Sequence, residues 1–329
     1  MKKKDDFSKM GKISRLMLET AQEMGIGYEI VHPPYVYRLK KAKKEAFFYA
    51  TYMPINQLSG SKVSDHKKIT KKVWEKHNIP VAKDFIINKN NWQGKIKEKE
   101  INIKFPVVLK PLSGTIQGYG VVTDIKTKRQ LNYTVKKMIK KGIKQFLVEE
   151  FYSGLNDYRV LVLNGKVIAG AKRVPAYVEG DGKKNIKELI NEKNMKRTAE
   201  KKIKLGKIKI DLELKNSLKT EKLKLKSILT NGRKLQLKNV CNLATGGEVE
   251  NVTDQICAYN KKLAIKAAES IDLNFAGLDF LCKDISKPLK EGKGILIEVN
   301  EQPDFALHHF PQKGKSVNVA KQLINASLK

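Results

Sequence analysis

Two apolar runs joined by Asn164-Gly165 restrict the possible folds of this chain more than any other feature. Residues 159–163 read Arg-Val-Leu-Val-Leu, and residues 166–170 read Lys-Val-Ile-Ala-Gly. Asn-Gly is the preferred two-residue turn of a β-hairpin, because both residues adopt the positive φ that the turn requires. The two runs are therefore predicted to be antiparallel neighbours, which excludes a doubly wound parallel sheet and favours an α+β fold.

Local patterns predict further strands and helices around this hairpin. Apolar runs predict extended segments over 28–31, 105–110, 121–123, 146–148, 276–281 and 295–299. Helical spacing of apolar residues predicts helices over about 13–25, 65–78, 127–141 and 256–270. In the second helix, Ile69, Val73 and Trp74 are expected to form the buried face. The pattern assigns no element to residues 41–63, and residues 183–240 are rich in lysine with helical stretches.

The composition limits the classes of protein to which this chain can belong. Its 329 residues are 41% hydrophobic, which is enough for a sizeable core in about two domains. There is no run of 18 apolar residues, and the basic start of the chain lacks the apolar segment of a signal peptide. The three cysteines have no metal-binding or disulfide spacing. A cytoplasmic protein without a membrane span is therefore expected.

The positive charge does not by itself indicate nucleic-acid binding. The chain has 66 lysines and arginines against 34 acidic residues, a net charge of +32, but only seven of the 66 are arginine. Proteins that read nucleic acids use arginine for bidentate contacts with phosphates and bases. The lysines are scattered among many Asn and Ile residues, so a compositional bias explains them better than a binding patch. No specific nucleic-acid partner is expected.

A glycine-rich segment follows the predicted strand 105–110. It runs from Lys110 to Gly120 as Lys-Pro-Leu-Ser-Gly-Thr-Ile-Gln-Gly-Tyr-Gly, and a second strand begins at 121. Closely spaced glycines let backbone N–H groups approach phosphate oxygens. The segment matches neither a Walker A loop nor the dinucleotide-binding Gly-x-Gly-x-x-Gly pattern. It is either a hairpin loop that folds over phosphates, with Lys110 beneath them, or an ordinary flexible hairpin.

Three side chains near the end of the chain carry hard oxygen atoms. Glu298 and Asn300 are two residues apart on a predicted strand and so project from one face of it, while Asp279 lies on the preceding strand. Carboxylate and amide oxygens suit a Mg²⁺ ion that also binds phosphates. The competing interpretation is a solvated glutamate and an asparagine in the turn after the strand. His308-His309 has no partner at metal-ligand spacing, so zinc is not expected.

Arginines and acidic residues around the hairpin are further candidates. Arg159 and Arg173 stand on the two sides of the Asn-Gly turn in a chain that otherwise uses lysine, which indicates a geometry that lysine cannot supply. For Arg173 the functional interpretation is a guanidinium that faces a transferring phosphoryl group, and the alternative is a surface arginine. The acidic pair Glu149-Glu150 follows a buried strand, where it can present a carboxylate and backbone groups to an adenine edge. Asp157 can accept hydrogen bonds from ribose hydroxyls.

Together these segments resemble the ATP-grasp carboxylate–amine ligases, most closely the ATP-grasp module of cyanophycin synthetase and also that of the fused bacterial glutathione synthetase. The matching segments follow one another in the family's order over about residues 65–325, and it is this order that is specific. They are 105–122, 148–175, 178–182, 242–247 with 253–254, 276–280, and 298–303 with His308. The resemblance implies an ATP-grasp fold, in which the nucleotide binds between two α+β lobes (65–148 and 149–329) that follow a small N-terminal lobe (1–64).

The resemblance also implies roles for individual residues. Two Mg²⁺ ions, or Mn²⁺ in their place, would be held by Asp279, Glu298 and Asn300. Arg173 would face the γ-phosphate and the acyl-phosphate, and Lys67 and Lys110 would grip the nucleotide phosphates. The other nucleotide contacts would be Ser113, Gly114, Gly118, Tyr119 and Gly120 over the phosphates, Glu149, Glu150, Phe151 and Tyr152 around the adenine, and Asp157 at the ribose. The substrate side would include Arg159, Thr245, Gly246, Gly247 and His308.

The sequence departs from the family pattern at three positions. His66 stands where the family has Asp, and Asp304 stands where it has Gly. D-Alanine–D-alanine ligases have an arginine two residues before the metal-binding aspartate; this chain has Gly277 there, so Arg173 is expected to act without that arginine. Within these 329 residues we expect no counterpart of the Mur-ligase-like domain of cyanophycin synthetase or of the glutamate–cysteine ligase half of the fused glutathione enzyme. Neither polymer synthesis nor glutathione production is therefore assumed.

The expected function is an ATP-dependent ligase that joins a carboxylate to an amine on an amino acid or short peptide, through an acyl-phosphate and with release of ADP and phosphate. A glutathione-synthetase-like ligase is the nearest alternative. Two others are a nucleotide-binding protein that has lost catalysis, against which the intact Arg173 and metal-ligand set argue, and a lysine-rich nucleic-acid binder. A homo-oligomer is compatible with the sequence.

Overall fold

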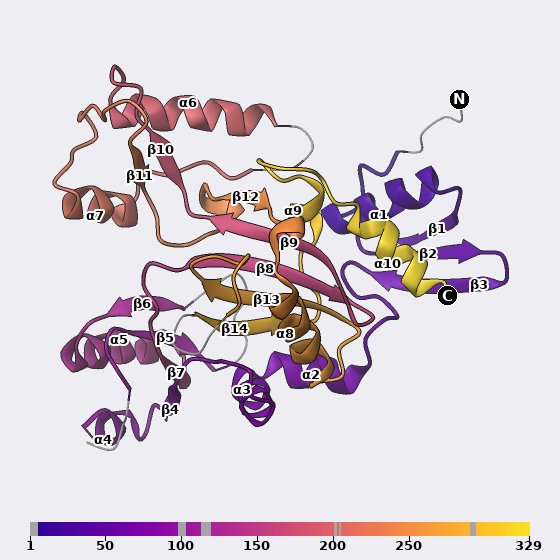
Figure 1. The fold of residues 1–329 in the computed structure, drawn as a ribbon, viewed down its shortest axis with the longest axis horizontal. Helices are drawn as coiled ribbons and strands as arrows, with labels where there is room; N and C mark the ends of the chain where they lie inside the picture. The colour runs from indigo at the N-terminus through magenta and orange to yellow at the C-terminus, as the bar shows by residue number, and fades with distance from the viewer. Residues whose placement is uncertain (1–5, 98–102, 113–119, 201–202, 204, 290–293) are drawn as a thin grey trace.

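The computed structural model describes residues 6–97, 103–112, 120–200, 203, 205–289 and 294–329. At its centre is an antiparallel five-stranded sheet in the order β12-β9-β8-β13-β14 (Figure 1). Its strands are β8 (Asn156–Leu163), β9 (Lys166–Val174), β12 (Glu248–Asn251), β13 (Phe275–Cys282) and β14 (Gly294–Asn300). The Asn-Gly hairpin is confirmed, because β8 pairs with β9 and the φ angles of Asn164 and Gly165 are 46° and 69°.

Alternation along the central strands gives the sheet two different faces. One face packs against α8 (Ala258–Glu269) through alternate residues of β8 and β13, namely Tyr158, Val160, Val162, Ala276, Leu278 and Phe280. The residues between them point the other way. On that other face one end is apolar, with Leu161, Leu163 and Phe275, and the other end is charged, with Asp157, Arg159 and Asp279. One end of the second face therefore belongs to the hydrophobic core, and the other end belongs to the candidate site.

A four-stranded antiparallel sheet in the order β4-β7-β5-β6 lies at the lower left of Figure 1. Its strands are β4 (Asp84–Asn88), β5 (Val107–Pro111), β6 (Val122–Ile125) and β7 (Gln145–Glu150), and its helices are α4 (Trp92–Lys97) and α5 (Lys128–Lys140). Leu131, Val135 and Met138 of α5 pack into its core. Because β5 pairs with β6, the glycine-rich segment connects two antiparallel strands, as predicted.

Residues 177–240 form a small unit with its own core, at the upper left of Figure 1. In this unit β10 (Tyr177–Glu179) pairs with β11 (Lys234–Gln236) beside α6 (Ile186–Ala199) and α7 (Leu212–Thr220). Asn185 and Glu188 form a capping box that fixes the start of α6. The two strands were not predicted, because three residues offer too few alternating positions for a periodic signal.

The N-terminal residues share a core with the C-terminal helix, at the right of Figure 1. This part contains α1 (Lys12–Glu23), α10 (Val319–Ser327) and a three-stranded sheet of β1 (Gly27–His32), β2 (Val36–Lys41) and β3 (Lys44–Tyr49). Met17 of α1, Leu323 of α10 and Leu161 of the central sheet are all fully buried in this core. The division of the chain at residues 64 and 148 stays a prediction.

Helix α3 (Lys67–Lys76) corrects one prediction. Its buried residues are Thr70, Lys71 and Trp74, whereas Ile69 is 45% exposed and Val73 is only partly buried. The buried face is turned relative to the predicted one, because the amino group of Lys71 reaches carboxylates inside the protein. A pattern that counts every lysine as exposed cannot find such a face.

The remaining elements are α2 (Leu58–Asp65), η1 (Leu243–Thr245), η2 (Thr253–Gln255) and α9 (Ala306–His309). The other predicted helices and strands are confirmed, with ends that differ by a few residues. Within the ranges that the structure describes, no helix is long and apolar enough to cross a membrane.

Candidate active site

The strand register of the central sheet brings charged residues together. Arg159 of β8 is opposite Asp279 of β13, and Asp279 is in turn opposite Glu298 of β14. Asp157 of β8 is opposite Arg173 of β9. Side chains that are opposite or diagonal across antiparallel strands lie within contact distance. Two arginines and three carboxylates therefore gather on the sheet face opposite α8, and we call this set the arginine–carboxylate group.

Asp279 is paired with both arginines of this group. Arg159 donates from Nε to Oδ1 and, at 2.9 Å, from Nη2 to Oδ2, and Arg173 Nη2 also lies 2.9 Å from Oδ2. Arg173 donates to Asp157 Oδ1 as well, at 3.0 Å from Nε and 2.6 Å from Nη2. Burial alone would raise the pKa of Asp279, but the charges of Arg159 and Arg173 outweigh it and hold the pKa below its ordinary value. Asp279 is therefore ionised, and two carboxylates fix the orientation of Arg173.

The position two residues before Asp279 lacks an arginine, but a guanidinium reaches Asp279 from the next strand. A Cβ atom on Gly277 would lie 2.7 Å from Cβ of Pro303 and 3.0 Å from Cδ of Arg159. The side chain of Arg159 thus occupies the space over Gly277 and ends at Asp279. Arg159 was predicted on the substrate side. The structure shows that it also contacts Asp279, which lies 120 residues further along the chain.

Glu298 and Asn300 lie side by side, as their spacing predicts. Asn300 Nδ2 is 3.5 Å from Glu298 Oε1, and Lys67 Nζ of α3 is 3.7 Å from Glu298 Oε2. The side chain of Glu298 is 33% exposed, against 5% for Asp279. The fold therefore brings a predicted phosphate-binding lysine next to a predicted metal-binding carboxylate from a distant part of the sequence.

The oxygen atoms at this edge of the sheet fit Mg²⁺. Asp279, Glu298 and Asn300 offer two carboxylates and an amide from adjacent strands, and Mg²⁺ in proteins often takes one or two carboxylates together with phosphates. Both oxygens of Asp279 accept from arginines, but a carboxylate has about four lone-pair sites, so it can ligate a metal as well. In the described part of the chain, no three His, Cys, Asp or Glu side chains form a metal-binding cluster.

A second charged cluster is buried where the four-stranded sheet meets α3. Glu149 of β7 forms ion pairs with Lys110 of β5 and, at 2.5 Å, with Lys71. Lys71 also lies 2.8 Å from Asp84 of β4. Burial would raise the pKa of Glu149, but the charges of Lys110 and Lys71 outweigh it and lower the pKa below its ordinary value. Glu149, predicted at the adenine, is thus an ionised partner of Lys110, which is predicted at the phosphates.

The residues predicted around the adenine lie at and just after the end of β7. Glu150 accepts a hydrogen bond from the hydroxyl of Tyr152 at 3.3 Å. The backbone N–H of Phe151 donates to the carbonyl of Pro106, so that group already has a partner within the protein. Asp157, predicted at the ribose, is paired with an arginine. The nucleotide contacts of these residues stay predictions.

Most of the glycine-rich segment, including Ser113, Gly114, Gly118 and Tyr119, lies outside the described residues. Gly120, where the description resumes, has a φ of 77°, and a Cβ atom there would lie 2.9 Å from Cγ of Pro111. A side chain at this position would therefore be strained and crowded, which explains the glycine.

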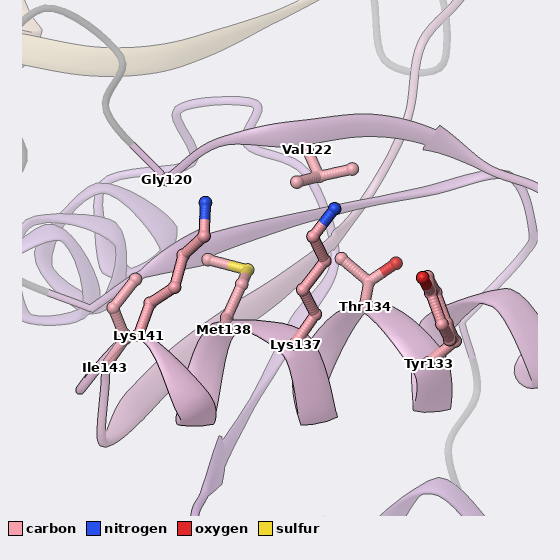
Figure 2. A pocket seen from close by; sticks show the side chains of 8 residues that line it. All are labelled: Gly120, Val122, Tyr133, Thr134, Lys137, Met138, Lys141 and Ile143. Carbon is pink, nitrogen blue, oxygen red and sulfur yellow. The ribbon is translucent and has the colours of Figure 1, made fainter.

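A hollow of about 250 Å³ lies beside Gly120, between α5 and β6. Figure 2 shows Lys137 of α5 and Lys141, the residue directly after α5, on either side of Met138, with their amino groups directed toward Val122 and Gly120. No carboxylate is among the residues that line this hollow. It is therefore distinct from the arginine–carboxylate group.

The predicted Thr245-Gly246-Gly247 segment forms the turn between η1 and β12. Gly246 has a φ of 106°, and β12 then pairs with β9 so that Val249 is opposite Arg173. Arg197 of α6, which is 4% exposed, holds the turn by donating to the carbonyls of Gly206, Leu243 and Gly247 at 2.7, 2.8 and 3.0 Å. Arg197 was not among the predicted site residues, although an arginine in a chain that otherwise uses lysine was an available signal.

His308 is buried close to the same arginines. Its side chain is 1% exposed, and neither ring nitrogen has a hydrogen-bond partner within the described residues. Burial, with a smaller contribution from Arg159 and Arg173, lowers the pKa of His308 to about 3. The imidazole is therefore neutral near pH 7, and its role toward a substrate stays a prediction.

Comparisons with known proteins agree with the motifs. Cyanophycin synthetase of Trichormus variabilis is 32% identical over 317 residues, which are 94% of this chain and 34% of that protein. A bifunctional glutathione biosynthesis protein of Clostridium perfringens is 29% identical over 303 residues, 88% of this chain and 36% of that protein. The structure of a bifunctional glutathione synthetase from Pasteurella multocida superposes with a TM-score of 0.73 at 24% identity, covering 97% of this chain and 43% of that one.

The chain spans about a third of the length of the curated relatives it matches. The predicted ATP-grasp fold is confirmed by the match to a family model. The model of the RimK-like ATP-grasp domain matches residues 64–211 and 232–327, which include both charged clusters and the Gly246 turn. With that match over most of its length, the protein belongs to the RimK-like ATP-grasp family.

Proposed function

We propose that this protein is an ATP-dependent carboxylate–amine ligase that forms an amide on an amino acid or short peptide. The observation that carries the proposal is that cations and carboxylates lie together at one end of the central sheet. Arg173 is fixed by Asp157 and Asp279, and Lys67 lies 3.7 Å from Glu298. Cations for phosphates and oxygen ligands for a divalent ion are thus adjacent.

In the first proposed step a substrate carboxylate oxygen attacks the γ-phosphorus of ATP, and the bond to the bridging β–γ oxygen breaks to release ADP. Arg173 offsets the negative charge on the phosphoryl group as it transfers, while Lys67 and Lys110 hold the nucleotide phosphates. Asp279, Glu298 and Asn300 would hold Mg²⁺, which supplies further neutralisation of phosphate charge when bound. The fixed orientation of Arg173 means that little reorganisation is needed during transfer.

In the second step an amine attacks the acyl carbon of the acyl-phosphate, the bond from that carbon to the phosphate oxygen breaks, and the nitrogen loses a proton. The amine would approach on the side of the Gly246 turn and His308, because Val249, just beyond that turn, is opposite Arg173 and because His308 is close to both arginines. The relatives named cyanophycin synthetase and glutathione synthetase support a substrate of amino-acid or peptide type.

The test is a screen of amino acids and dipeptides, singly and in pairs, for phosphate release from ATP in the presence of Mg²⁺. At least one pair is expected to give phosphate and an amide product in equal amounts. Glu298→Gln should lose this activity, and Glu75→Gln, on the exposed face of α3, is the matched control that should keep it. Equal activity of the two variants would contradict the site assignment.

A further inference from the structure

Lys71 is a buried cation to which the proposed reaction assigns no role. Its side chain is 2% exposed, and its Nζ lies 2.5 Å from Glu149 Oε1 and 2.8 Å from Asp84 Oδ2. It also donates to the carbonyl of Ala82 at 2.9 Å. Burial lowers the pKa of Lys71, but the charges of Glu149 and Asp84 outweigh this and raise it above its ordinary value. Lys71 is therefore a permanent positive charge inside the protein.

Lys71 and Lys110 share one carboxylate. Glu149 contacts Lys71 through Oε1 and Lys110 through Oε2. The register places Glu149 opposite Asp84 of β4 on one side and Val108 of β5 on the other, so Lys110 is its diagonal neighbour. The two lysines therefore approach the same carboxylate from different elements, one from α3 and one from the sheet.

The cluster holds one more positive charge than its carboxylates neutralise. Among the residues that the structure describes, its three lysines, Lys68, Lys71 and Lys110, contact two carboxylates, Asp84 and Glu149. If Lys71 were neutral, the remaining two lysines would be balanced by the two carboxylates. Lys110 would then be the cation on which a buried Glu149 depends, and a buried carboxylate without a cation is strongly disfavoured.

We propose that Lys71 is a positioning residue that keeps Lys110 available to nucleotide phosphates by sharing the charge of Glu149. When a nucleotide binds, the amino group of Lys110 turns from Glu149 to a phosphate oxygen, and Lys71 alone continues to neutralise Glu149. The inference rests on the proposed function, because it takes Lys110 as a phosphate contact.

The test measures the binding of ADP and of adenosine by calorimetry at one fixed Mg²⁺ concentration. In Lys71→Met the affinity for ADP should fall relative to that for adenosine by about tenfold or more, the scale of one charge-assisted hydrogen bond. Lys72→Met, an exposed neighbour on the same helix, should leave the ratio of the two affinities unchanged. If the role of Lys71 were purely structural, Lys71→Met would lower the affinities for ADP and adenosine by the same factor. That result would overturn the proposal.

Two further variants should raise the ratio of ADP affinity to adenosine affinity, one relative to the wild type and one relative to Lys71→Met. Glu149→Gln frees Lys110 from its carboxylate, so the ratio of ADP affinity to adenosine affinity should rise. If Lys71→Met does not fold, this variant still tests the proposal, because an unchanged ratio would contradict it. The double variant Lys71→Met/Glu149→Gln should recover the ratio that Lys71→Met loses, whereas a further loss would contradict the proposal. A wild-type protein that binds neither ADP nor ATP would instead remove the proposed function itself.

Discussion

Replacement of Gly277 by alanine tests whether Arg159 needs the space above this residue. The added Cβ would lie 2.7 Å from Cβ of Pro303 and 3.0 Å from Cδ of Arg159, so a neighbour must move. Pro303 is a buried, rigid residue, and the more flexible arginine is expected to shift away from Asp279. Overpacking of this kind costs about 1–3 kcal/mol of unfolding free energy.

The displacement of Arg159 adds an effect on activity. A hydrogen bond to a charged group contributes about 1.5–3 kcal/mol, so loss of the Arg159–Asp279 contact predicts a roughly 10- to 100-fold fall in phosphate release. Urea unfolding and the phosphate assay measure the two effects. Gly94→Ala is the matched control, because no atom of the described residues lies within 4 Å of its added Cβ. A Gly277→Ala variant as stable and as active as Gly94→Ala would refute this reasoning.

Three other predictions follow from the charged residues. Glu298→Gln should lower turnover by at least about 100-fold while its circular dichroism stays unchanged, and near-normal turnover would remove the metal assignment. Because their pKa values are lowered in the folded state, Glu149 and Asp279 stabilise the folded protein at pH values above their ordinary pKa values of 4.5 and 3.8. This stabilisation is lost as the pH falls through the lower pKa values of the folded state. Urea unfolding should therefore show a free energy that declines below about pH 4.5, less steeply in Glu149→Gln, and an equally steep decline in that variant would contradict the pairing. Duplex DNA should bind only weakly, with a Kd of about 10⁻⁴ to 10⁻⁶ M at physiological salt, and a nanomolar sequence-specific complex would revive nucleic-acid recognition.

The parts of the fold that were predicted are those with strong local signals. The Asn164-Gly165 turn fixed the pairing of β8 with β9, and the period of two placed Glu298 beside Asn300. The three-residue strands β10 and β11 were not predicted, because an alternating hydrophobic pattern needs more positions to be recognised. The buried face of α3 was predicted correctly for Trp74 but wrongly for Ile69. Lys71 was missed because it is held inside by ion pairs, and hydrophobic spacing does not register a paired lysine.

The site was predicted as a set of residues but not as a set of contacts. Nothing near Asp279 in sequence indicates that Arg159 would cross over Gly277 to reach it, since that contact depends on strand order. The pairing of Lys110 with Glu149 likewise arises from the order of β5 and β7. Residue type, spacing and the family resemblance selected the candidate residues, and their chemical roles stay predictions. Which of their charges neutralise one another became known only from the fold.

The most direct test of the central claim follows the oxygen atoms of the substrate carboxylate. With an ¹⁸O-labelled carboxylate substrate from the screen, ATP, Mg²⁺ and hydroxylamine as the amine, we expect a hydroxamate, ADP, and phosphate that carries one ¹⁸O atom. This result requires that the carboxylate attacks the γ-phosphorus, where Arg173, Lys67 and Lys110 are proposed to act. Appearance of the ¹⁸O atom in AMP, with release of pyrophosphate, would show attack at the α-phosphorus and contradict the account.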